Sequence, residues 1–251
     1  MWDLRGDVFD PLLELVLPRH CVGCRRPGVA LCGECAPGDG IHRLQIAGLD
    51  VVAAGRYADG LRAALLAYKE RGRRDLARPL GRQLGAAVAQ SVAARQRGAV
   101  ARARAPQVVL VWPPSSPAVV AARGGDHLGR LARHAAVLAG VRVAPGVLVP
   151  TRQVLDSAGL GIAARAENLR GSMRALPPPG SRPRTAPGGA SLLSAGAVAV
   201  VVDDIVTTGA TLREAGRALA EAGWTVFAAA VVAATPRRVP PQPLAVPRSA
   251  V

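Results

Sequence analysis

The sequence predicts an α/β fold in which helices flank a parallel β-sheet, preceded by a small cysteine-rich module. An apolar strand over 197–202, an amphipathic helix over 211–222 and an apolar strand over 224–233 form a strand–helix–strand unit. Such a unit has parallel strands and a right-handed crossover. All 4 cysteines lie between Cys21 and Cys35, in two pairs of the form C-x2-C.

Length and composition exclude several classes of protein. The chain has 251 residues and is 50% hydrophobic, too apolar for a wholly disordered protein and long enough for one large domain with a small module. The apolar stretch 8–17 contains Asp10, Pro11 and Glu14, so we expect a short helix there rather than a membrane span. No signal peptide is recognisable, and we expect a cytoplasmic protein with reduced cysteines.

The four cysteine side chains are predicted to hold one structural Zn2+ in a closed tetrahedral site. They are Cys21, Cys24, Cys32 and Cys35. A redox pair or unused thiols are the alternative, and His20 or His42 could replace a cysteine that does not bind. Residues 1–48 are too few for a core of their own, so we expect metal binding to supply the folding energy of this module.

Strands and helices alternate through the middle of the chain. The predicted order is a strand over 49–57, a helix over 61–70, a long helix from an Asp75 cap to about Arg97, a strand over 108–112 and a helix over 128–138. Residues 151–194 lack strong periodicity and are predicted to form a flexible loop or insertion. A proline-rich, disordered tail is predicted over 236–251, which leaves 49–235 as the main domain.

The segment after the strand at 197–202 suits a phosphorylated sugar. We expect a polar turn from Asp203 to Gly209 at the carboxyl end of a parallel strand, where ligands of such sheets bind. Backbone N–H groups and threonine hydroxyls there can hold a phosphate, and the two carboxylates can accept hydrogen bonds from ribose hydroxyls. An acidic strand end followed by an ordinary helix cap is the alternative. The expected site comprises Asp203, Asp204, Thr207, Thr208, Gly209, Ala210 and Thr211.

This segment resembles the phosphoribosyl pyrophosphate (PRPP) loop of type I phosphoribosyltransferases. Together with the cysteine module, it makes the chain similar to the ComF family, named for competence in DNA uptake. The resemblance implies a phosphoribosyltransferase-like sheet and PRPP bound with Mg2+. It also implies that the acidic pair contacts the ribose 2′- and 3′-hydroxyls and that residues 207–211 hold the 5′-phosphate.

Weaker elements extend the resemblance along the chain. They are Tyr68-Lys69, Val111 to Pro114, Arg123-Gly124, and the set Leu160, Arg165 and Asn168. By this resemblance Lys69 and Arg123 are the candidates for binding pyrophosphate. Gly125-Asp126 departs from the Phe-Asn typical of the family, on the side where pyrophosphate and the second substrate would bind.

Three functions fit these features. The first is transfer of a phosphoribosyl group to a nitrogenous base, with release of pyrophosphate. The second is the handling of single-stranded DNA in uptake and recombination, together with other competence or recombination proteins. This function would use the basic stretch 56–104, for which a solvated helix face is the alternative. The third is a regulator that senses PRPP without turnover.

Overall fold

A six-stranded sheet forms the centre of the molecule in the computed structural model, which describes residues 19–36, 40–46, 48–98, 106–152, 162–178 and 196–235. The strand order is β1-β2-β8-β7-β3-β4. β1 pairs antiparallel with β2, and every other neighbouring pair is parallel. The strands are β1 (His42–Ile46), β2 (Leu49–Arg56), β3 (Val108–Val111), β4 (Arg142–Val143), β7 (Val198–Val206) and β8 (Thr225–Ala234). The predicted α/β class with a mostly parallel sheet is confirmed.

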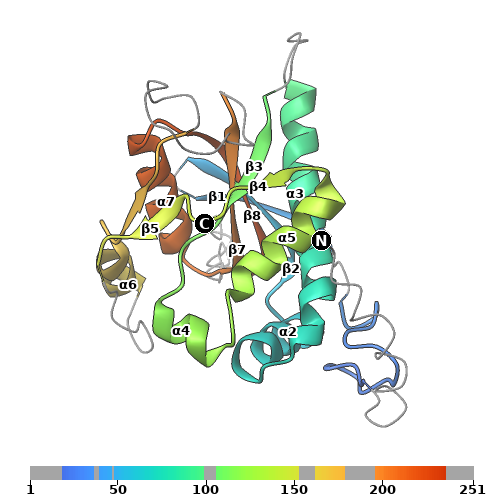
Figure 1. Cartoon of the computed structure of the whole chain (residues 1–251). Coiled ribbons are helices and arrows are strands. Elements are labelled where there is room, and N and C mark those ends of the chain that lie inside the picture. The colour runs from blue at the N-terminus through green and yellow to red at the C-terminus, as the bar shows by residue number, and fades with distance from the viewer. Residues whose placement is uncertain are drawn as a thin grey trace, which may run out of the picture.

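Helices cover both faces of this sheet (Figure 1). They are α2 (Asp59–Glu70), the 3-10 helix η1 (Arg74–Leu76), α3 (Ala77–Gly98), α4 (Pro117–Ala122), α5 (His127–Ala139), α6 (Ile162–Leu169) and α7 (Ala210–Glu221). Val200 and Val202 of β7 pack into one core with α2, α3 and α5, whereas Val201 packs into a second core with α7. Successive residues of a strand point to opposite faces, so the sheet separates two hydrophobic cores.

Two glycines of α3 allow α5 to lie unusually close. A Cβ atom on Gly85 would fall 2.7 Å from Cδ2 of Leu138, and one on Gly81 would overlap Cβ of His134. An alanine at Gly81 would force the helices apart, whereas an alanine at Gly85 would displace the exposed end of the Leu138 side chain. The helices α3 and α5 therefore form one tightly packed layer.

A two-stranded antiparallel ribbon, β5 (Leu148–Pro150) with β6 (Met173–Ala175), lies beside α7. The buried Glu214 carboxylate of α7 accepts hydrogen bonds from the Met173 N–H at 3.1 Å and from Arg217 at 2.7 Å. Arg217 also donates to the Met173 carbonyl at 2.8 Å. One buried acid and its arginine thus fix the ribbon to the helix.

Several elements differ from those predicted. Residues 151–194, predicted to form a flexible loop or insertion, contain α6 and β6, and residues 153–161 and 179–195 lie outside the described residues. Asp75 lies inside η1 and accepts from Arg73 at 2.7 Å, so it does not cap α3. The short β1, α4, β4 and β5 were not predicted, because pairing and packing rather than periodicity hold such short elements. The expected helix at 8–17 and the tail lie outside the described residues.

Candidate functional site

The four cysteines gather around one point near the N-terminus. Their Sγ atoms all lie within 4.8 Å of one another, and the Cys21–Cys32 and Cys24–Cys32 Sγ pairs are each 3.6 Å apart. Thiolates around a tetrahedral Zn2+ with Zn–S bonds of ~2.3 Å are ~3.8 Å apart, which this spacing fits. In the described part of the chain, the cluster that can hold a metal consists of the cysteines, without His20 or His42.

Backbone N–H groups favour the thiolate form of Cys21, which is the form that binds a metal. The Arg25 N–H donates to the Cys21 carbonyl at 2.9 Å, which closes the first turn. The Cys32 N–H points at the Cys21 sulfur from 3.4 Å. Burial by itself raises the pKa of the Cys21 thiol, but N–H groups directed at its sulfur outweigh burial and lower this pKa to about 6. The thiolate that a metal requires is therefore favoured.

The cysteine module packs against the rest of the molecule, next to α2 (Figure 1). Val22, Ala30 and Leu31 contact the core under α2, α3 and α5. Arg73 donates to the His20 carbonyl at 3.2 Å, and a Cβ on Gly60 would overlap the Cys35 carbonyl. The module is thus held by apolar packing as well as by its own turns.

Asp203 and Asp204 lie within β7, not in a turn. Their strand continues to Val206 because it keeps pairing with β8, where Ile205 is opposite Ala233. The predicted polar turn from Asp203 is therefore wrong; the turn begins after Val206. β3 ends at Val111, opposite Val201. The end of β7 thus extends beyond β3 and has a strand partner on one side only.

The loop from Thr207 to Gly209 connects β7 to α7 and surrounds a small pocket. The pocket is lined by Asp203 and by all residues from Ile205 to Leu212. Gly209 has a φ of 77°, and a Cβ there would overlap the side chain of Ile46 on β1. Glycine is therefore required both for the backbone conformation and for the space. The structure brings six of the seven predicted site residues to this pocket; the exception is Asp204.

Asp204 faces the other side of the sheet, where it is buried beside Lys69 and His127. Its Oδ2 lies 2.5 Å from Nζ of Lys69 and 3.4 Å from Nε2 of His127. Burial by itself raises the pKa of this carboxyl, but the hydrogen bonds and charges of His127 and Lys69 outweigh burial and hold the pKa well below its usual range. Asp204 is thus a buried, ionised carboxylate.

Asp203 has the opposite electrostatic environment. Its Oδ1 accepts a hydrogen bond from the Asp204 N–H at 2.9 Å. Burial and the negative charge of Asp204 raise the pKa of the Asp203 carboxyl far above its usual range. The protonated form of Asp203 is therefore favoured before a ligand binds.

His127 is a site residue that the sequence analysis missed. It is 6% exposed, and Tyr68 donates to its backbone carbonyl at 2.8 Å. Arg123 NH1 lies 3.2 Å from its Nε2, and Arg123 NH2 lies 3.6 Å from Glu70. Both pyrophosphate candidates therefore lie around His127. No local pattern marks this histidine, because its role depends on where α5 begins relative to β7.

Asp126, which departs from the resembled family, contacts Trp112 in the loop after β3. Asp126 accepts from the Trp112 ring N–H at 3.0 Å and caps α5 by accepting from the Gly129 N–H at 2.9 Å. Together they fix the loop after β3 to the start of α5, where His127 lies.

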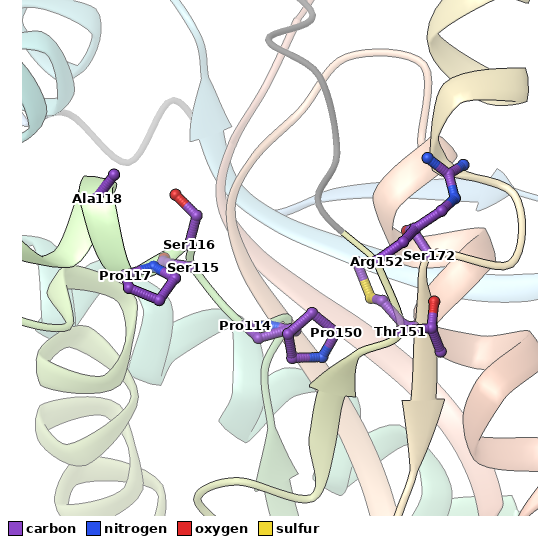
Figure 2. Close-up of a pocket in the computed structure, with 10 residues that line it drawn as sticks. Pro114, Ser115, Ser116, Pro117, Ala118, Pro150, Thr151, Arg152 and Ser172 are labelled. Carbon is purple, nitrogen blue, oxygen red and sulfur yellow. The ribbon is translucent and has the colours of Figure 1, made fainter.

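A larger pocket of about 560 Å³ lies between the loop after β3 and the β5–β6 ribbon. Figure 2 shows Ser115, Ser116, Pro117 and Ala118 on one side, and Thr151, Arg152 and Ser172 on the other. Ser172 is 1% exposed, and its Oγ has no hydrogen-bond partner in the described part of the chain. The pocket thus has polar residues on both sides, and in the described part of the chain one buried hydroxyl there has no partner.

The basic residues of α3 partly share one surface. Arg74, Arg78 and Arg82 are exposed at four-residue spacing, so they follow one side of η1 and α3. Burial and the charges of Arg78 and Arg82 lower the pKa of His134 on α5. The positive surface therefore extends from α3 towards α5. No helix within the described ranges is long and apolar enough to span a membrane.

Part of the sequence that forms this site matches a known protein family. Residues 158–243 match the family described as phosphoribosyl transferase domain. This range includes β7, α7, β8 and the whole loop from Thr207 to Gly209. No curated protein matches the chain at a significant level. The chain therefore contains a phosphoribosyltransferase domain within a mixed α/β fold that also carries an N-terminal four-cysteine cluster.

Proposed function

We propose that this protein binds PRPP together with Mg2+, with the ribose 5-phosphate part held by residues 203–211. The observation that carries the proposal is the loop pocket within the matched domain, at the N-terminus of α7. Gly209 is the N-cap residue of α7, and the first residues of the helix, from Ala210 to Leu212, line this pocket. Backbone N–H groups and the positive end of the helix dipole favour a phosphate there.

The described side chains divide the work of binding PRPP. The hydroxyls of Thr207, Thr208 and Thr211 donate to the 5′-phosphate, and the carboxyl oxygens of Asp203 and Asp204 accept from the ribose hydroxyls. Lys69 and Arg123 bind the pyrophosphate. Mg2+ supplies positive charge that neutralises the pyrophosphate.

The reaction to be tested is phosphoribosyl transfer. A nitrogen of an acceptor base forms a bond to C1 of the ribose while the C1–oxygen bond breaks, and pyrophosphate leaves with that electron pair. Positive charge develops on the sugar, so positioning and charge stabilisation supply the catalysis. A PRPP-sensing regulator would bind the same ligand in the same way without this step.

A thermal-shift titration with PRPP and Mg2+ tests binding. We expect PRPP to raise the melting temperature of the wild-type protein, as any ligand specific for the folded state does. Thr211→Val removes one hydroxyl at nearly constant shape and should weaken binding about tenfold. Thr225→Val makes the same change at the exposed start of β8 and should leave binding unchanged. No stabilisation of the wild type would refute the proposal.

Release of pyrophosphate from PRPP across a panel of nitrogenous bases then separates an enzyme from a sensor. Release with one base, lost in an Asp204→Asn variant that is shown to be folded at the assay temperature, would establish transfer. Stabilisation by PRPP without release for any base would favour the sensor.

The exposed arginines of η1 and α3 favour a second candidate function, binding of single-stranded DNA during DNA uptake or recombination. Phosphate contacts by these side chains would make affinity fall steeply with salt. We expect Arg78→Gln with Arg82→Gln to weaken binding and reduce the salt slope. Arg174→Gln, on exposed β6, is the control. Fluorescence anisotropy of a labelled oligonucleotide measures both, and binding that is absent or insensitive to salt would reject this function.

A structural Zn2+ in the cysteine cluster is also part of the proposal. It accords with a ComF-like protein of the cytoplasm, where thiols stay reduced. We expect purified protein to contain one equivalent of zinc by elemental analysis. Cys24→Ser should lose zinc, while Ser91→Ala, a buried serine on α3, should retain it. Zinc-free protein with full thermal stability would contradict a structural role.

A further inference from the structure

Asp204, proposed above to accept from the ribose, is already paired with a lysine. Nζ of Lys69 lies 2.5 Å from Oδ2 of Asp204, and the two side chains are only 19% and 8% exposed. A ribose hydroxyl that donates to this oxygen competes with a charge-assisted hydrogen bond, which is stronger than a neutral one. The pair therefore opposes the binding of a ribose at this carboxylate.

Lys69 can leave Asp204 without a change of fold. It lies in the last turn of α2, which ends at Glu70. Among the described residues, its ammonium forms an ion pair with Asp204. A lysine carries its charge on a flexible four-carbon stem, so Nζ can move while the helix stays in place. A ligand with more negative charge than one carboxylate would draw it away.

His127 remains beside Asp204 after such a movement. Its ring lies 3.4 Å from the carboxylate, and Tyr68 and Arg123 hold its backbone and ring. A buried carboxylate that loses every partner is strongly destabilising, but one that keeps a partner is less so. The site thus has one fixed partner for Asp204 and one that can leave.

We propose that Lys69 is a specificity-determining residue that exchanges Asp204 for the pyrophosphate group when PRPP binds. This inference rests on the function proposed above. PRPP and ribose 5-phosphate share the diol and the 5′-phosphate, so both bring hydroxyls that compete with Lys69 for Asp204. PRPP offers the ammonium a new partner, whereas ribose 5-phosphate offers none. The lysine therefore makes the site prefer PRPP over the sugar phosphate from which pyrophosphate is absent.

Lys69 is the only lysine in the sequence, so its side chain can be observed by itself. Protein labelled with lysine carrying ¹³C at Cε gives one side-chain signal in a heteronuclear NMR spectrum. We expect saturating PRPP with Mg2+ to shift this signal, because the ammonium changes partner. An unshifted Lys69 signal at a PRPP concentration that saturates the thermal-shift response would overturn the inference.

Substitution gives a second, independent test by calorimetric titration. In Lys69→Met we expect PRPP affinity to fall about tenfold, the loss of one charge-assisted phosphate contact. Ribose 5-phosphate affinity should rise several-fold, because its competitor at Asp204 is gone. Arg71→Met removes an exposed cation at the C-cap of α2, two residues after Lys69, and should change neither affinity. Equal changes for both ligands in Lys69→Met would show a merely structural role.

The two proposals fail in different ways. If wild-type protein binds neither ligand, the proposed function is wrong. If it binds PRPP but the preference over ribose 5-phosphate is unchanged in Lys69→Met, only the role of Lys69 is wrong. The NMR measurement on wild-type protein decides the same question if Lys69→Met does not fold.

Discussion

The adjacent aspartates of β7 lie on opposite faces of the sheet, and their pKa values are shifted in opposite directions. On the face covered by α2 and α5, Asp204 is buried between Lys69 and His127, which lower its pKa. On the α7 face, Asp203 lines the loop pocket, and burial with the charge of Asp204 raises its pKa. Two carboxylates that look equivalent in the sequence therefore prefer different protonation states.

The difference arises because Asp203 and Asp204 are neighbours on one strand and face different sides of the sheet. Because successive side chains point to opposite faces, the helices on each face set the charge of one aspartate only. On the face of α2 and α5, Lys69 and His127 keep Asp204 ionised. On the α7 face, the backbone of the loop lies beside Asp203, a carboxyl that is easily protonated.

The largest effect is expected for Asp204→Asn. This change leaves Lys69 and His127 without their buried anion, which should lower the free energy of unfolding by about 3–5 kcal/mol at pH 7. The pKa of the Asp204 carboxyl is lower in the folded state than in the unfolded state. The carboxyl therefore stabilises the fold at pH values above its unfolded pKa, and this contribution is lost as the pH falls. Urea denaturation should therefore show the loss shrinking towards pH 3, and an equal loss at all pH values would contradict the assignment.

Helical glycines on the two faces should respond with opposite signs. Gly81→Ala on α3 would overlap Cβ of His134, and we expect a loss of about 1–2 kcal/mol after the gain in helix propensity is included. Gly216→Ala on α7 meets nothing within 4 Å and should gain up to about 1 kcal/mol. Thermal unfolding of both variants measures the difference. A stabilising Gly81→Ala would refute close packing of α3 and α5.

Asp203→Asn should act against the direction of Asp204→Asn. Since the folded pKa of Asp203 is raised, the wild type loses stability as pH rises through that pKa. The asparagine variant should exceed it by about 1 kcal/mol at pH 8 and match it below about pH 3, where the carboxyl is protonated in both states of the wild type. Denaturation across this pH range measures the crossover, and a less stable variant at pH 8 would show that Asp203 is ionised.

The smallest effect concerns the buried hydroxyl of the larger pocket. Ser172→Ala removes an oxygen that lacks a partner and should raise the free energy of unfolding by up to about 1 kcal/mol. Ser91→Ala removes a buried hydroxyl that donates to the Ala87 carbonyl at 3.0 Å, and should not stabilise. Equal effects in the two variants would show that Ser172 is satisfied in solution.

Much of the sheet was predictable, but its polar end was not. The strand at 197–202 and the helix and strand after it are strongly periodic, and each lies within two residues of its predicted start. Asp203 and Asp204 suggested a turn because acidic residues are rare in strands. Pairing with β8 kept them in β7, and this pairing is a tertiary contact that no local pattern reveals.

By itself the sequence determined the features that depend on spacing along the chain. These are the four-cysteine cluster, the β7–α7–β8 unit and the glycine loop, since turns and crossovers are set by nearby residues. Only the tertiary structure decided which basic side chains lie beside which carboxyl group. Lys69, His127 and Asp204 come from three separate elements, and they meet only because α2 and α5 pack on the same face of β7.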